Sequence, residues 1–185
     1  MPDRAKDGAG VEATGLLHLT VLNGHRILKL KSWFREFADG TRRVILAGRE
    51  LPVHVGETLV GSQRLLAIGP GEWLLIVPEM AYATFLEQIK NELDELGVVW
   101  VDLSDSLVRI ELRGPAARDV LSKGCGLDMH PGQFPAGRCA ATRCAGIPMI
   151  IEPVIDSGCF ILTLARSYLR YAQSWLRDAA VEFYT

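Results

Sequence analysis

The densest group of side chains that could do acid–base chemistry is Asp102, Ser104 and Asp105, between the apolar runs 98–103 and 107–112. General acid–base catalysis needs such carboxylates within reach of a reacting group. The sequence around them contains neither a nucleophile elbow nor a paired Ser/His motif. Asp and Ser also favour turns, where their side chains hydrogen-bond the local backbone. The pattern therefore predicts a structural turn and no catalytic residue.

Metal and thiol chemistry is not indicated either. Zinc sites usually draw on closely spaced pairs of Cys or His, and the sequence has no Cys-x-x-Cys and no two histidines four residues apart. We expect reduced, packed thiols and no metal ligand. The residues considered are Cys125, Cys139, Cys144, Cys159, His18, His25, His54 and His130.

One glycine-containing stretch, Gly69-Pro70-Gly71, could suggest a phosphate-binding loop. Dinucleotide and triphosphate loops open a helix, whereas here a strand pattern follows at 72–77. The stretch is therefore predicted to be a turn and Trp73 a core residue. No cofactor-binding residue is assigned.

Composition is that of a globular protein of one domain. The 185 residues are 49% hydrophobic and 23% charged, which is ordinary for such a domain. A net charge of −2 argues against nucleic acid as a partner. The first ten residues lack a signal-peptide core, and no apolar run approaches the ~20 residues that span a bilayer. We expect a cytoplasmic protein that does not bind a membrane.

Periodicity defines the elements that must position these residues. Asn23-Gly24 and Gly69-Pro70-Gly71 predict hairpin turns, and the break at 104–106 is compatible with a third. Helical spacing predicts helices at 80–96 and 167–180, and shorter ones at about 36–47 and 115–123, where Gly124 suits a left-handed helix end. Strand patterns occur at 16–22, 26–32, 64–68, 72–77, 98–103, 107–112, 138–144, 148–155 and 159–164.

The order of these elements repeats. Each half of the chain gives two strands, a helix, up to three strands and a longer helix, and the clearest counterparts are 72–97 and 158–181. We expect a disordered tail at residues 1–14, and a single domain at 15–185 made of two pseudo-repeated halves, about 15–97 and 98–185. Strands that outnumber helices in each half predict the α+β class, with helices packed on antiparallel or mixed sheets.

Charge is unevenly distributed along the chain. Basic residues predominate between Gly24 and Arg49, and between Glu72 and Asp105 eight acids accompany Lys90 alone. Such runs form either solvated faces or docking surfaces, because complementary charge steers association. The basic residues are Arg26, Lys29, Lys31, Arg35, Arg42, Arg43 and Arg49.

Three signatures resemble the gamma subunit family of heterotetrameric sarcosine oxidase. The first runs from Val101-Asp102-Leu103-Ser104-Asp105 through RGPAARDVLSKGCGLDMHP to FPAGRCAATRCAGIPMII. The second is Gly69-Pro70-Gly71-Glu72-Trp73-Leu74-Leu75, and the third is Ala165-Arg166-Ser167-Tyr168 with Trp175-Leu176. The resemblance covers roughly residues 48–180.

This resemblance implies a subunit of an enzyme that oxidatively demethylates sarcosine to glycine and passes the one-carbon unit to tetrahydrofolate. It implies alpha, beta and delta subunits as partners. FAD, FMN, NAD and tetrahydrofolate would belong to those partner subunits, and this chain would hold no cofactor and would not itself be catalytic. A further alternative is that this chain has the same supporting role in an oxidase for another N-methyl amine.

A more distant resemblance is to the folate-binding domain of the glycine-cleavage aminomethyltransferase, which implies the same duplicated fold. That family carries a catalytic carboxylate on the strand that corresponds to 146–154, where the only acid is Glu152 and the folate-activating position is Ile147, Pro148 or Met149. Lys123-Gly124-Cys125 is similar to a motif of folate-dependent iron–sulfur assembly proteins. The alternative function is therefore a stand-alone folate-dependent transferase or iron–sulfur assembly protein.

Overall fold

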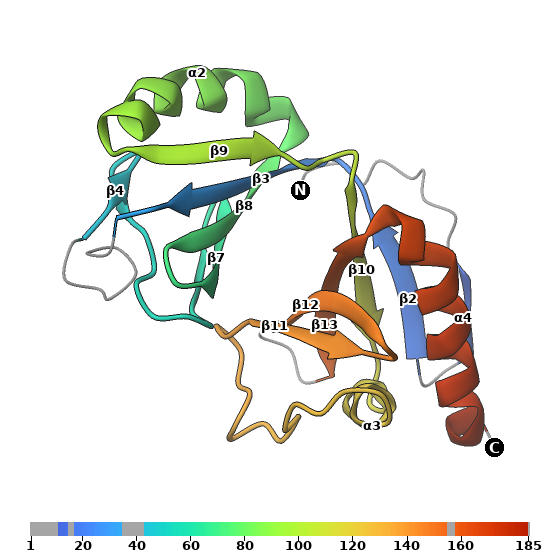
Figure 1. Ribbon diagram of the computed structural model, residues 1–185. Helices are drawn as coiled ribbons and strands as arrows, with labels where there is room; N and C mark the ends of the chain where they lie inside the picture. Colours follow the sequence, from blue (N-terminus) through green and yellow to red (C-terminus); the bar gives the residue numbers. More distant parts are fainter. Residues whose placement is uncertain (1–10, 15–16, 35–42, 155–157, 185) are drawn as a thin grey trace.

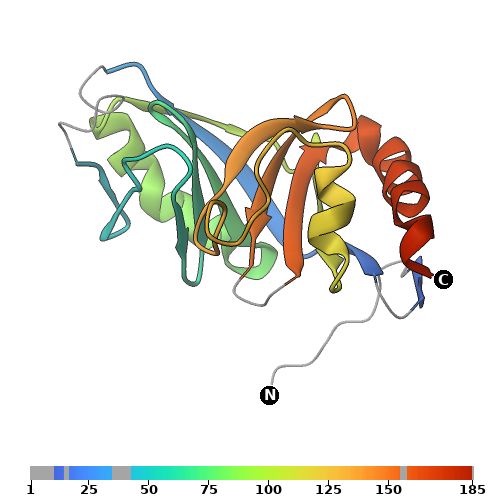
Figure 2. The ribbon, with the colours of Figure 1, turned by 90° about the horizontal axis from the view of Figure 1, so that it is seen from below.

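The computed structural model describes residues 11–14, 17–34, 43–154 and 158–184. Two antiparallel sheets lie face to face, and helices cover their outer faces (Figure 1). The helix α2 lies against one sheet, and α3 and α4 lie against the other, as the view from below shows (Figure 2). The predicted α+β class is confirmed.

The five-stranded sheet has the order β6 (Thr58–Val60), β7 (Arg64–Gly69), β8 (Glu72–Pro78), β3 (His25–Ser32) and β9 (Val98–Asp102). The six-stranded sheet has the order β1 (Val11–Thr14), β2 (Leu17–Leu22), β10 (Leu107–Arg113), β13 (Cys159–Ala165), β12 (Ile147–Pro153) and β11 (Ala140–Cys144). A small ribbon pairs β4 (Ile45–Leu46) with β5 (Arg49–Glu50). The helices are α2 (Glu79–Glu95), α3 (Ala117–Ser122) and α4 (Leu169–Ala180), with 3₁₀ turns at Arg166–Tyr168 and Val181–Tyr184.

The two sheets have corresponding strand orders. The strand β2 of the first half lies in the sheet formed by the second half, and the strand β9 of the second half lies in the sheet formed by the first half. Read from the exchanged strand, one sheet runs β9-β3-β8-β7-β6 and the other β2-β10-β13-β12-β11. The helices α2 and α4 follow the corresponding strands β8 and β13. The predicted boundary at about residue 97 therefore separates sequence halves that both contribute to both sheets.

Two of the expected hairpins are wrong, although their strands are right. The strands β2 and β3, joined at Asn23-Gly24, do not pair with each other. β2 pairs with β10, and β3 pairs with β8 and β9. The strands β9 and β10 likewise belong to different sheets. In the middle of its sheet, β3 buries Leu28 and Leu30 on one face and Ile27 on the other, which a two-stranded hairpin cannot do. The β7–β8 hairpin is confirmed.

The core consists of three apolar layers. Phe85, Ile89 and Leu93 of α2 pack on the outer face of the five-stranded sheet, where Trp73 is 3% exposed. Helices α3 and α4 cover the outer face of the six-stranded sheet. Between the sheets, Ile27, Leu66, Leu74 and Ile76 meet Cys139 and the partly buried Leu107 and Ile150. Burial of apolar surface in these layers is the main stabilising contribution.

Two predictions near the N-terminus need correction. Val11–Thr14, in the predicted disordered tail, form strand β1 and pair with β2, while residues 1–10 lie outside the described residues. The helix expected at about 36–47 is wrong at its end, since Ile45–Leu46 form β4. Ala47 and Gly48 have positive φ angles of 48° and 71°, so the chain turns here and cannot continue a helix. Residues 35–42 are not described.

A glycine is required at position 124 by packing, which the sequence pattern does not show. Its residue type suggests a left-handed helix end, but its neighbour Lys123 closes α3 with φ −65° in the right-handed region, and Gly124 is not among the residues with positive φ. A Cβ at Gly124 would lie 2.5 Å from the Trp175 ring. The glycine is needed so that α4 can approach the end of α3.

Gly124→Ala is expected to lower the free energy of unfolding by ~1–3 kcal/mol, the usual cost of overpacking. Gly126→Ala is the matched control, because a Cβ at Gly126 meets nothing within 4 Å; its change should stay within about 0.5 kcal/mol. Urea unfolding followed by Trp fluorescence measures both. Equal stabilities of the two variants would contradict the close approach of Trp175.

Candidate functional site

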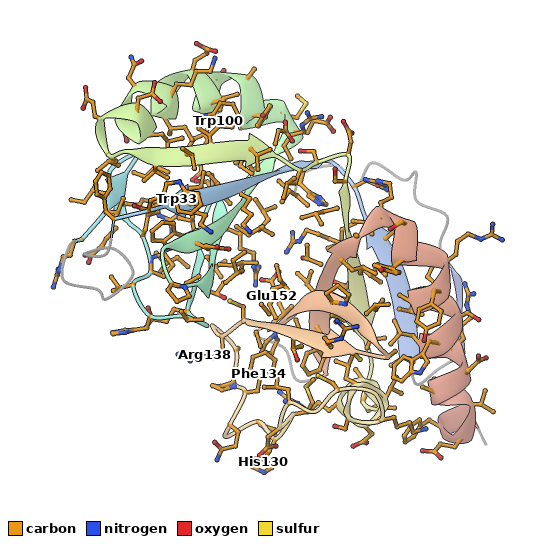
Figure 3. All side chains as sticks on the ribbon, in the orientation of Figure 1. Trp33, Trp100, His130, Phe134, Arg138 and Glu152 are labelled. Carbon is orange, nitrogen blue, oxygen red and sulfur yellow. The ribbon has the colours of Figure 1, made fainter. Side chains whose placement is uncertain are left out.

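The centre of the molecule holds a charged network between the inner faces of the two sheets. Glu152 on β12 is 0% exposed, and Arg109 on β10 is 5% exposed. Arg109 Nη2 donates to Glu152 Oε1 at 2.6 Å, and Arg64 Nε, from β7 in the other sheet, donates to Oε2 at 2.6 Å. Glu152 therefore links the two sheets (Figure 3).

This network has the chemistry of a structural ion cluster. Both carboxylate oxygens of Glu152 are occupied by guanidinium donors, so Glu152 has no oxygen directed at a substrate. Burial lowers the pKa of Arg109, and the charge and hydrogen bond of Glu152 oppose that shift. A buried charge needs such partners, because the unpaired ion would cost several kcal/mol. Sequence reasoning missed both arginines.

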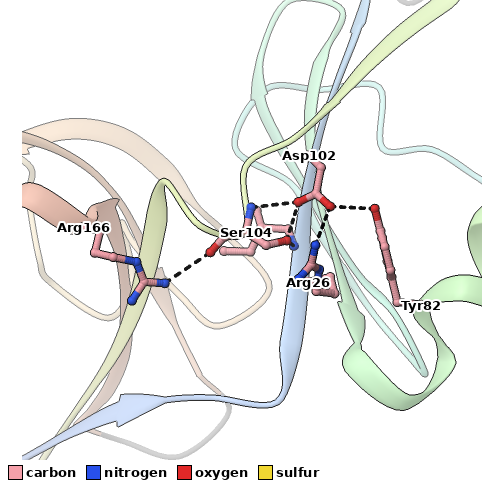
Figure 4. Close-up of polar contacts among 6 residues, drawn as sticks. Arg26, Tyr82, Asp102, Ser104 and Arg166 are labelled. Carbon is pink, nitrogen blue, oxygen red and sulfur yellow. Dashed lines mark hydrogen bonds and ion pairs between the residues drawn. The ribbon is translucent and has the colours of Figure 1, made fainter.

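A second polar cluster surrounds the predicted turn after β9 (Figure 4). Asp102 Oδ1 accepts the Ser104 backbone N–H at 2.9 Å, which is the local turn bond that the residue types predict. Asp102 Oδ2 accepts Arg26 Nη2 at 2.9 Å and the Tyr82 hydroxyl at 2.7 Å. Ser104 Oγ in turn accepts the Ile27 N–H. The cluster thus ties β3, β9 and α2 together.

The pKa shifts of Asp102 and Tyr82 favour a structural role for this cluster. Burial alone would raise the pKa of Asp102, but hydrogen bonds from Ser104, Tyr82 and Arg26 outweigh it and lower that pKa. Burial and the bond to Asp102 raise the pKa of Tyr82 to about 12. A general base or acid working near neutral pH needs a pKa close to that pH. Neither group has one.

Arg166, in the 3₁₀ turn that follows β13, contacts the same turn. Its guanidinium donates to the carbonyl oxygens of Ser104, Asp105 and Leu107, at 3.2, 2.9 and 3.0 Å. Arg166 lies in the Ala165–Tyr168 signature, so this signature positions the crossing from β9 to β10.

β12 corresponds to the strand 146–154, on which the resemblance to the transferase implies a catalytic carboxylate. Its residues Ile147 and Met149 point into the core beneath α3 and α4. Pro148 points to the inner face and lines an open apolar pocket of about 510 Å³ with Leu107, Ile150 and Thr163. The residues that line this pocket include no carboxylate. The lining of this pocket therefore offers no carboxylate that could polarise a folate nitrogen.

The cysteine and histidine residues form no reactive site among the described residues. All four cysteines are buried and reduced, and burial raises the pKa of Cys139 to about 11 and of Cys144 to about 12. Low-pKa, exposed thiols are the reactive ones. Over the described ranges no three His, Cys, Asp or Glu side chains could hold a metal ion. His130 is an exposed loop residue.

Lys123-Gly124-Cys125 also has a packing role. Lys123 Nζ pairs with Glu182 at 2.7 Å and lies 4.8 Å from the Phe183 ring centroid. Cys125 is 8% exposed within the core cluster. The motif joins α3 to the C-terminal helix.

Much of the charge contrast noted in the sequence is resolved within the molecule. On the inner face, Lys29 and Lys31 pair with Glu72 at 2.9 and 2.7 Å, and these ion pairs lower the pKa of Glu72. Arg26 pairs with Asp102, and Arg43 with Glu50 at 3.3 Å. The basic strand β3 thus sits between the acids of β8 and β9. Arg35 and Arg42 lie outside the described residues.

Comparison of sequences identifies relatives. A model of the "Sarcosine oxidase, gamma subunit family" matches residues 36–182. The sarcosine oxidase subunit gamma of Corynebacterium sp. (strain P-1) is 37% identical over 138 residues, which cover 74% of this chain and 66% of that relative. The chain thus spans just under two thirds of the length of the curated relatives it matches.

Comparison of structures agrees with this result. A chain of the heterotetrameric sarcosine oxidase from Corynebacterium sp. U-96 superposes with a TM-score of 0.77 and 27% identity, over 96% of this chain and 90% of that one. The glycine-cleavage aminomethyltransferase T from Bartonella henselae gives a TM-score of 0.61 at 12% identity, over 88% of this chain and 45% of that one. The second likeness shows a shared fold only.

Glu152→Gln is expected to lower the free energy of unfolding by ~3–5 kcal/mol, because it removes one partner of a buried ion cluster and leaves two arginines facing each other. Glu72→Gln is the matched control. Glu72 also joins two cations, but its side chain is 24% exposed, so its loss should stay below about 1 kcal/mol. Urea unfolding at constant ionic strength measures both, and equal losses would contradict the structural role of Glu152.

Proposed function

Because the chain belongs to the sarcosine oxidase gamma subunit family, we propose that it is the non-catalytic gamma subunit of a heterotetrameric sarcosine oxidase. In this role it supports the assembly of a complex that oxidatively demethylates sarcosine to glycine, with one-carbon transfer to tetrahydrofolate. The complex contains alpha, beta and delta subunits, and it works in the cytoplasm. Among the described helices, none is long and apolar enough to cross a membrane.

The observation that carries this proposal is the use of Glu152. In the transferase that this chain resembles, the corresponding strand holds a catalytic carboxylate, whereas here the one acid on β12 is enclosed by Arg64 and Arg109. The remaining polar clusters brace turns and strand crossings. Because these buried and half-buried ionisable clusters stabilise the fold, we expect the chain to contribute to the complex through its exposed surfaces.

The cofactors of the reaction follow the same division. We propose that FAD, FMN, NAD and tetrahydrofolate are bound by the partner subunits. The turn at Gly69-Pro70-Gly71 supports this, because it joins β7 to β8 in a hairpin and opens no helix. A phosphate group therefore meets no helix N-terminus there.

Co-expression with the candidate alpha, beta and delta subunits tests the proposal. An affinity tag on this chain should recover all four polypeptides in equal amounts, with flavin absorbance in the complex and none in the chain purified alone. Omission of this chain should leave the other subunits incompletely assembled. Stoichiometric flavin in the isolated chain, or a full-activity oxidase assembled without it, would contradict the proposal.

A further inference from the structure

We propose that the open edge of β9 receives an extended segment of another sarcosine oxidase subunit, which adds a sixth strand to the five-stranded sheet. This inference rests on the proposed function, since it places the contact within the oxidase complex. The occupant would alternate apolar and basic side chains.

The first observation is an unpaired strand edge. Among the described strands, β9 pairs only with β3 and ends its sheet. The Leu103 N–H donates to Ile27 O at 2.8 Å, and bonded pairs alternate along an antiparallel ladder. The register therefore bonds Val101 to Lys29 and Val99 to Lys31. The backbone N–H and C=O groups of Val98 and Trp100 point to the open edge.

The second observation is the apolar surface beside this edge. Val99 and Val101 are 53% and 49% exposed, and Trp33, which follows β3, is 73% exposed. Trp100 packs on the helix side, and because side chains alternate along a strand, Val99 and Val101 lie on the face away from α2. Trp33 also lies away from α2 (Figure 3). Long, apolar edge strands invite pairing with another chain, and proteins usually protect them.

Two other sheet edges, at β6 and β11, are protected. At the far edge of the same sheet, β6 has three residues, and Thr58 N–H donates to Gly137 O. At one edge of the other sheet, the backbone of Cys125 forms an isolated antiparallel β-bridge with Cys144 of β11. The edge of β9 has no corresponding cover among the described residues.

The internal symmetry indicates what fits this edge. In the two corresponding strand orders, β9 occupies the position of β2. The outer edge of β2 is paired with the antiparallel strand β1. The fold thus accommodates a strand at this position in one sheet, and within the described ranges no strand occupies the equivalent position beside β9.

Charge specifies the character of the occupant. The helix α2 lies across β9 and exposes Glu79, Glu87, Asp94 and Glu95, while its one cation, Lys90, already pairs with Glu87. Side chains of an added strand alternate between the two faces. Those on the helix side would meet acids, and those on the other side would meet Val99, Val101 and Trp33. A basic and apolar alternation is therefore complementary.

The test uses the four co-expressed subunits and the double variant Val99→Lys/Val101→Lys. Two lysines beside the edge would have to be desolvated by the added strand, so recovery of the partner subunits should fall at least about tenfold. Val60→Lys is the matched control, because Val60 is a 56% exposed valine on the opposite edge strand of the same sheet, and it should assemble normally.

Hydrogen exchange supplies a second readout that does not depend on the variant. The amides of Val98 and Trp100 should exchange rapidly in the isolated chain and become protected in the complex. Normal assembly of the double variant without such protection would overturn this inference alone, and failure of the wild-type chain to assemble would overturn the proposed function. Protection already present in the isolated chain, or a homodimer broken by the two lysines, would show another occupant and overturn the inference.

Discussion

The relative position of the two sheets depends on the burial of one carboxylate. Glu152 has no exposed surface, so its charge must be compensated within the protein, and one of its two compensating cations comes from the opposite sheet. An apolar contact would tolerate sliding of one sheet over the other, but a two-point bond to Arg64 and Arg109 does not. The network therefore fixes the relative position of the two sheets more than it adds to the free energy of unfolding, because the desolvation of three charges offsets most of their attraction.

The exchange of the first strands makes this arrangement a single unit. Since β2 and β9 each cross to the other sheet, neither sequence half can complete its own sheet. Both crossings occur beside the Asp102 cluster, where Arg26, Tyr82 and Arg166 fix the backbone. The polar residues that look most like catalytic groups in the sequence are thus found where the chain changes sheets. In a fold shared with an aminomethyltransferase T, they stabilise the strand crossings.

Sequence periodicity predicts the elements well and their pairing poorly. The apolar stripe of α2 and the β7–β8 hairpin follow from local spacing, which is why they could be predicted. Asn23-Gly24 specifies a reversal of the chain, but a reversal does not determine whether the flanking strands share a sheet. The network around Glu152 was hidden because Arg109 alternates with apolar residues, as on a solvated face, and that face is covered by a second sheet. One signal was available in the sequence. Glu152 is the only acid in the otherwise apolar segment 147–153, and a buried carboxylate needs a cation beside it.

We propose that this chain works through its surfaces and performs no folate chemistry on β12. Titration of tetrahydrofolate into the isolated full-length chain, followed by calorimetry under anaerobic conditions, tests it most directly. Because the β12 positions hold core residues, Pro148 and an enclosed Glu152, we expect no saturable heat of binding. Saturable, one-to-one binding of tetrahydrofolate would contradict the account.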